Sequence, residues 1–167
     1  METTTDNEQE PPPASVVAIH KHAARLVRDG LLTQGGAADV QRALERALVE
    51  SRRDLVTVAA LIDGLFQALT DGLLAPGLFV VDEARGIARF HLAPVLSMLV
   101  EARLLTGATV ARLRHLLPVI EEWFPDAGLS GVRQRFTFAR RDRRRGLELD
   151  LAKGRAFLKR TEAVPSR

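Results

Sequence analysis

The chain has no cysteine among its 167 residues, and this absence excludes several kinds of protein at once. Without a thiol there is no disulfide framework, no thiolate ligand for zinc or an iron–sulfur cluster, and no cysteine nucleophile. A chain without cysteine fits a reducing compartment, so we expect a cytoplasmic protein.

The sequence also lacks a long apolar run. Even the apolar segment Leu55–Ile62 is closed by Asp54 and Asp63, whereas a membrane-spanning helix needs about 18 or more apolar residues. Residues 1–14 carry four acidic side chains and no Lys or Arg, unlike the basic start of a secretory signal peptide. We expect these residues, which include Pro11–Pro13, to form a disordered acidic tail, and we expect no contact with a membrane.

Length and composition predict one folded domain. With 46% hydrophobic and 27% charged residues, the chain is long enough to bury a core and too short for two ordinary domains. We expect a single mainly helical domain over residues 15–160 and a frayed tail over residues 161–167.

The strongest structural signal is an apolar stripe between residues 39 and 70. Its apolar residues recur at intervals of three, four or seven, which keeps them on one face of a helix. One long helix and two shorter ones both remain open, because Ser51–Asp54 resembles a new helix start. A stripe of this length is also a candidate seam for a helical bundle or a homodimer. The seam residues are Val40, Leu44, Leu48, Leu55, Val58, Ile62, Leu65 and Leu69.

Shorter patterns predict the remaining elements. Helical spacing of apolar residues predicts helices over residues 16–29, 94–105 and 107–117, and Pro118 interrupts the last of these. Two β-rich runs about the polar connection 82–86 predict a hairpin over residues 79–90, and a change to period two predicts a second hairpin over 133–151. The predicted fold is therefore α+β, mainly α, with a body of four to six helices and two β-hairpins.

We expect the second hairpin to have one apolar side, which buries Phe136 and Phe138. The matching apolar residues of its second strand are Leu147, Leu149 and Leu151. The sequence does not fix the register of the two strands, but on the other side it allows two basic residues of the first strand to lie opposite two acidic residues of the second. These are Arg133 and Arg135, with Glu148 and Asp150.

Positive charge is concentrated near the C-terminus. Residues 130–167 contain 12 Lys/Arg and 4 Asp/Glu, a net charge of +8, whereas residues 1–129 have a net charge of −5. Such a basic segment predicts an anionic partner, most often nucleic acid. Asp142 is the only acid among five arginines at the predicted hairpin tip, and an arginine fork binds phosphate through two hydrogen bonds. The tip arginines are Arg140, Arg141, Arg143, Arg144 and Arg145.

Two helices joined by a tight turn precede this hairpin, in the element order of a winged helix-turn-helix protein. In that arrangement the second helix enters the major groove of DNA, and the hairpin, the wing, lies along the phosphates. The groove-facing candidates on the second helix are Arg112, Arg114 and His115. We therefore predict a non-catalytic protein that binds nucleic acid, with DNA ranked ahead of RNA and the choice between them left open, with phosphate contacts from the tip and support from Arg112 and Arg114.

The alternative function is a non-catalytic helical interaction module with no nucleic-acid role. In that case the apolar seam forms a bundle or dimer contact, and the acidic Pro-rich tail and the basic end contact protein partners.

No catalytic or cofactor-binding motif is complete. Gly128–Gly131 resembles a nucleophile elbow, but its second glycine falls one residue too early. Lys153 has neither the Gly-rich approach nor the following Ser or Thr of a phosphate-binding loop. His20 and His22 are two residues apart, which places them on different sides of a helix and not together on a metal. We expect no enzyme activity, no cofactor and no metal.

Two neighbouring residue pairs have a structural explanation. Glu121 and Glu122 fall in the first turn of a predicted helix, where the helix dipole favours acidic side chains. Trp123 and Phe124 end that helix, and we expect both in the core because the chain has few aromatic residues.

Overall fold

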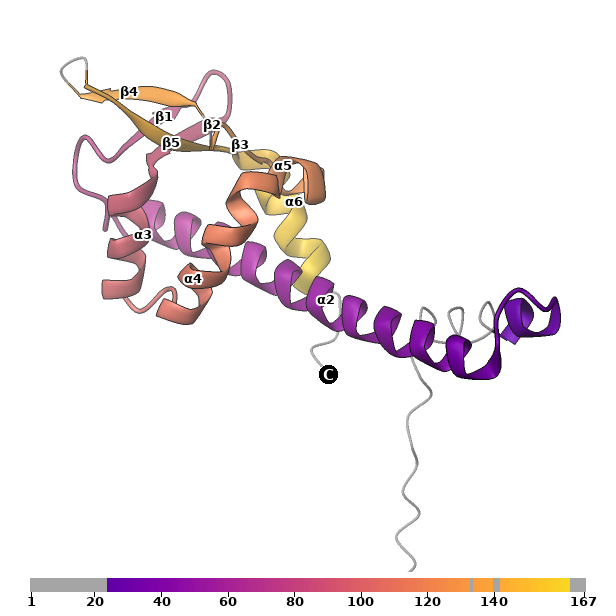
Figure 1. The fold of residues 1–167 in the computed structure, drawn as a ribbon. Coiled ribbons are helices and arrows are strands. Elements are labelled where there is room, and N and C mark those ends of the chain that lie inside the picture. The colour runs from indigo at the N-terminus through magenta and orange to yellow at the C-terminus, as the bar shows by residue number, and fades with distance from the viewer. Residues whose placement is uncertain (1–23, 133, 140–141, 163–167) are drawn as a thin grey trace, which may run out of the picture. The chain divides into compact units, whose positions relative to one another are not determined.

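The computed structural model describes residues 24–132, 134–139 and 142–162, and it has the predicted α+β, mainly α architecture (Figure 1). The chain divides into two compact units, Met1–Arg52 and Arg53–Arg167. The expected acidic tail 1–14, the first part of the helix expected over 16–29, and residues 163–167 of the expected C-terminal tail lie outside the described residues.

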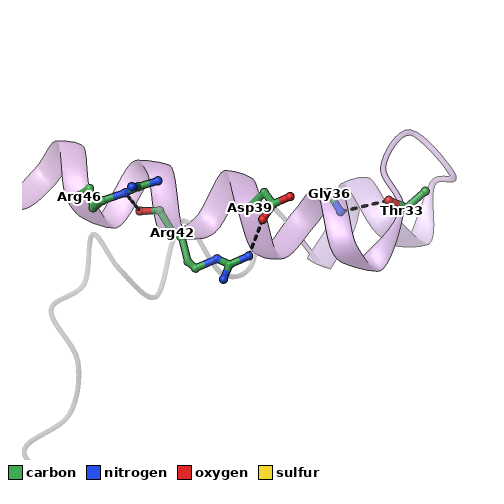
Figure 2. A network of polar contacts seen from close by, with 5 residues as sticks. All are labelled: Thr33, Gly36, Asp39, Arg42 and Arg46. Atoms are coloured by element: carbon green, nitrogen blue, oxygen red, sulfur yellow. Dashed lines mark hydrogen bonds and ion pairs between the residues drawn. The ribbon is translucent and has the colours of Figure 1, made fainter.

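In the first unit, residues 24–28 are helical and end at Gly30, whose φ of 71° suits a residue without a Cβ atom. A second helix, α2 (Gln34–Thr70), follows, and the Oγ1 atom of Thr33 accepts a hydrogen bond from the backbone N–H of Gly36 at 3.1 Å. Figure 2 shows this start and the exposed contacts after it, in which Arg42 pairs with Asp39. Since α2 runs without a break to Thr70, residues 39–70 form one helix and Ser51–Asp54 starts no new one.

The second unit buries the later part of α2. Val58, Leu61 and Ile62 have no exposed surface, and Leu65 is 1% exposed. Full burial of one such side chain stabilises the fold by about 1.5–3 kcal/mol. The core that covers them includes Phe90, Leu99, Leu113, Ile120, Leu147 and Leu149.

An antiparallel sheet contributes further residues to this core. Its strands are β1 (Phe79–Asp82), β2 (Ile87–His91), β3 (Leu129–Ser130), β4 (Arg135–Ala139) and β5 (Asp142–Asp150). The order is β1-β2-β5-β3, and β4 also pairs with β5. Both predicted hairpins are confirmed, as β1–β2 and β4–β5. Phe90 lies opposite Leu147, and both side chains are buried in the same core as Leu99 and Leu113.

Four α-helices follow β2 within the described residues. They are α3 (Leu92–Glu101), α4 (Gly107–Leu116), α5 (Ile120–Trp123) and α6 (Leu151–Glu162), with short 3-10 turns at Leu117–Val119 and Pro125–Ala127. The Oγ1 atom of Thr106 caps α4 by accepting a hydrogen bond from the N–H of Thr109 at 3.1 Å. The helices predicted over 94–105 and 107–117 are therefore confirmed as α3 and α4, and Pro118 falls in the 3-10 turn after α4.

The register of the second hairpin, which the sequence did not fix, contradicts the predicted apolar side. Phe136 lies opposite Arg144, and Arg135 lies opposite Arg145. Partners across a ladder share a face, so Phe136 lies on the face away from Leu147, and the predicted shared apolar side is wrong. The reason is that Leu147 and Leu149 pair with β2 and β3, not with β4.

The register also excludes the charge pair that the sequence allowed for Arg135, which faces another arginine, and Arg133 lies outside the described residues. Glu148 pairs instead with Arg89 of β2, and Leu151 begins α6. Trp123 is 57% exposed, so only Phe124 of the expected core pair packs against the core.

Candidate nucleic-acid interface

Exposed arginines occupy both strands of the β4–β5 hairpin. Arg143, Arg144 and Arg145 lie on β5, and Arg135 lies on β4. Arg140 and Arg141 fall outside the described residues. Arg135 and Arg145 are direct cross-strand partners, and like charges in that position destabilise a hairpin.

The two faces of the hairpin carry different chemistry. Arg143 and Arg145 alternate with Arg144, so they share the face of Leu147 and Leu149, but nearer the hairpin tip. We call this the inner face. Leu147 and Leu149 are buried, whereas Arg143 and Arg145 are exposed. The inner face thus changes from apolar to cationic between Leu147 and Arg145.

Arg145 and Arg114 line the same groove. This groove, of about 690 Å³, lies between α3 and α4 and reaches the base of the hairpin. Its lining is mainly apolar and includes Leu96, Val100, Val110 and Val132, with Glu101 as its acid. The structure therefore brings together two of the predicted site residues from elements far apart in the sequence.

Arg112 has a different environment from Arg114. Its Nε atom lies 2.6 Å from the Oδ1 atom of Asp54 on α2, and the two side chains are 32% and 15% exposed. This half-buried ion pair joins α4 to α2, so we assign Arg112 to the packing of the fold. Its neighbours Arg114 and His115 are exposed in the last turn of α4.

The opposite side of the sheet carries an aromatic and cationic cluster that sequence reasoning missed. We call this side the outer face. The Arg89 guanidinium lies 5.1 Å from the centre of the Phe136 ring, and the His91 ring stacks on Phe138 with 5.6 Å between ring centres. Arg89 also donates to the Oε2 atom of Glu148 at 2.8 Å. The alternation of buried Ala88 and Phe90 with Arg89 and His91 along β2 is a signal that identifies this face.

Residues singled out for chemistry elsewhere have structural partners. Glu121 accepts a hydrogen bond from the backbone N–H of Gly131 at 2.8 Å, next to the glycine turn before β4. The backbone N–H of Lys153 donates to the Oδ1 atom of Asp150 at 3.0 Å, which caps the start of α6.

Across residues 24–132, 134–139 and 142–162, no three His, Asp or Glu side chains gather as metal ligands would. The described helices include none that is both long enough and apolar enough to cross a membrane. No protein-family model matches this chain, and no curated protein or solved structure matches it either.

Proposed function

We propose that this protein binds nucleic acid without catalysing a reaction, and that the arginines of the β4–β5 hairpin contact the phosphates. The observation that carries the proposal is the cross-strand pair Arg135 and Arg145, with Arg143 on the same face. Within the described residues, none of these three arginines forms an ion pair. A phosphate between such side chains relieves their repulsion and accepts charge-assisted hydrogen bonds.

The arrangement of elements supports a winged-helix-like mode of binding. The chain contains α2, β2, α3, α4 and the β4–β5 hairpin in this order, with β1 before β2 and with α5 and β3 between α4 and the hairpin, and β2 pairs with β5. In this mode α4 approaches the major groove with Arg114 and His115, and the hairpin lies along the backbone. Duplex DNA is the proposed target ahead of RNA, because the deep, narrow major groove of RNA does not admit a helix.

The proposed contacts are sequence-independent phosphate contacts from Arg135, Arg143, Arg144 and Arg145. Arg140 and Arg141, which lie between the two strands in the sequence, stay within the proposed interface, and Arg112 leaves it because of its ion pair. Affinity from such contacts falls steeply with salt, because each phosphate that is neutralised releases counterions.

The salt dependence of binding tests the proposal. Fluorescence anisotropy of a labelled duplex is measured from low to physiological salt with the wild type and with Arg143→Ser/Arg144→Ser/Arg145→Ser. We expect the triple variant to bind more weakly and to flatten the slope of log K against log salt by about three units.

A control variant removes the same charge elsewhere, at the exposed residues Arg28, Arg42 and Arg85, each replaced by Ser. We expect it to keep the wild-type slope. The proposal fails when the wild type shows no binding at low salt, or when both triple variants flatten the slope of log K against log salt by the same amount.

A second candidate function is self-association through the first part of α2. Val40, Leu44 and Leu48 recur every four residues and are 37%, 41% and 37% exposed, respectively. The later seam residues Val58, Ile62 and Leu65 are buried in the protein's own core, and Leu55 and Leu69 pack against it. Only the earlier part of the predicted seam is therefore left for a second copy of the chain.

Sedimentation analysis of Leu44→Glu/Leu48→Glu tests this second function. We expect a dimer of the wild type that the double variant converts to a monomer. Val49→Glu is the control, because Val49 is 53% exposed and lies on another side of the helix. A monomeric wild type at every concentration rejects self-association.

A further inference from the structure

The outer face of the sheet has features that phosphate binding alone does not explain. Phe136 and Phe138 are half-buried, and they stand on the side of the sheet opposite the core. The helices α3 and α4 lie on the other side of the sheet (Figure 1). Two aromatic rings on the outer face of a basic hairpin combine the two features that proteins use to bind single-stranded nucleic acid.

We propose that Phe136, Phe138 and His91 form a stacking surface for unpaired bases, and that the protein binds single-stranded nucleic acid through this surface in addition to duplex DNA. This inference rests on the proposed nucleic-acid binding and adds a second form of nucleic acid to it. A base in a duplex is already paired and stacked, so its faces are closed to these rings.

The rings are held in place before any base arrives. Phe136 and Phe138 meet edge to face, with ring centres 6.4 Å apart and an angle of 80° between the rings. His91 stacks on Phe138 at an angle of 21°. A ring fixed in this way loses little conformational freedom when a base stacks on it.

Glycines on two neighbouring segments make room for the rings. A Cβ atom at Gly146 would overlap the Phe136 ring and lie 3.0 Å from the Cζ atom of Phe138. A Cβ atom at Gly131 would lie 2.7 Å from the Cζ atom of Phe136. The Phe136 ring therefore sits against backbone without side chains, which fixes its position on the outer face.

Charge on the same hairpin complements the backbone of a single strand. Arg144 shares the outer face with Phe136, and Arg143 and Arg145 flank it along β5. Arg89 also lies against Phe136, but Glu148 balances its charge. Bases on the rings and phosphates on the β5 arginines thus occupy adjacent parts of one surface.

The experiment compares two labelled probes of equal length, an oligothymidylate strand and a duplex, by fluorescence anisotropy. The variants are Phe136→Leu and Phe138→Leu, which keep an apolar side chain and remove the ring. We expect the wild type to bind both probes. Each variant lowers single-strand affinity about tenfold, and duplex affinity and the salt slope stay unchanged.

Trp123→Leu is the matched control, because it removes an aromatic side chain that is 57% exposed outside this face. It leaves both affinities unchanged. A measurement on the wild type covers the case in which a Phe variant does not fold. Ring carbon signals of Phe136 and Phe138 shift when oligothymidylate is added, and signals of the core residue Phe90 do not.

The outcomes separate this inference from the proposed function. Failure of the wild type to bind the single strand while it binds the duplex, or single-strand binding that both Phe→Leu variants retain in full, overturns the stacking surface and leaves phosphate binding by the arginines intact. No binding of either probe at low salt overturns both.

Discussion

The ion pair between Arg112 and Asp54 yields the sharpest prediction about stability. Because Asp54 is only 15% exposed, removing Arg112 leaves a poorly hydrated carboxylate without this partner. A double-mutant cycle of Asp54→Ala, Arg112→Ala and the double variant isolates the energy of this pair from other contacts of Arg112.

The expected coupling follows from distance and exposure. The two atoms are 2.6 Å apart, and Arg112 is 32% exposed. Two unit charges about 4 Å apart attract by about 4 kcal/mol at the dielectric constant of a protein surface. Loss of hydration and of side-chain freedom offsets much of this attraction, so we expect a net coupling of about 1–2 kcal/mol.

Urea unfolding followed by far-ultraviolet circular dichroism measures the coupling. With a slope of about 2 kcal/mol per molar urea, 1–2 kcal/mol moves the midpoint by about 0.5–1 M. We also expect Arg112→Ala to leave the salt slope of nucleic-acid binding unchanged. If the free-energy changes of the two single variants add up to that of the double variant within about 0.3 kcal/mol, the pair does not stabilise the fold. The assignment of Arg112 to packing would then be refuted.

Two further predictions concern close packing. Gly128→Ala should destabilise the protein more than Gly86→Ala, because both glycines have positive φ but only at Gly128 would a Cβ atom meet neighbours, at 2.8 Å from the Cβ atom of Lys153. Urea unfolding should show that left-handed backbone strain lowers the free energy of unfolding by about 1–2 kcal/mol in both variants. The close contact should lower it by about 1–3 kcal/mol more in Gly128→Ala. Equal losses of free energy in the two variants would contradict the close approach. Leu61→Ala should lower the free energy of unfolding by about 2–5 kcal/mol, whereas Val56→Ala should change it by less than about 0.5 kcal/mol. Leu61 is 0% and Val56 64% exposed, and similar losses would show that this face of α2 is not buried.

The sequence predicts the elements whose causes are local. The boundary between α3 and α4 follows from apolar spacing and from the cap at Thr106, all within a few residues of one another. The two hairpins follow from a change of period to two around short polar connections. The apolar spacing over residues 39–70 likewise predicts helical structure but leaves one helix or two open, and the structure has one, α2.

The features that sequence reasoning missed depend on residues far apart in the chain. Asp54 and Arg112 are 58 residues apart, and Arg89 and Glu148 are 59 apart. Neither pair leaves a local pattern. The face on which Phe136 lies depends on the β4–β5 register, and a shift of one residue reverses every side chain of a strand.

That register determines how the candidate interface is divided. The arginines Arg143 and Arg145 continue the inner face beyond the core, where Arg145 and Arg114 line one groove. The rings of Phe136 and Phe138 stand on the outer face with Arg144. Backbone contacts from the inner face need no particular form of nucleic acid, whereas stacking on the outer face needs unpaired bases. Because different residues carry the two contributions, arginine variants should change the salt slope and phenylalanine variants the preference between single strand and duplex.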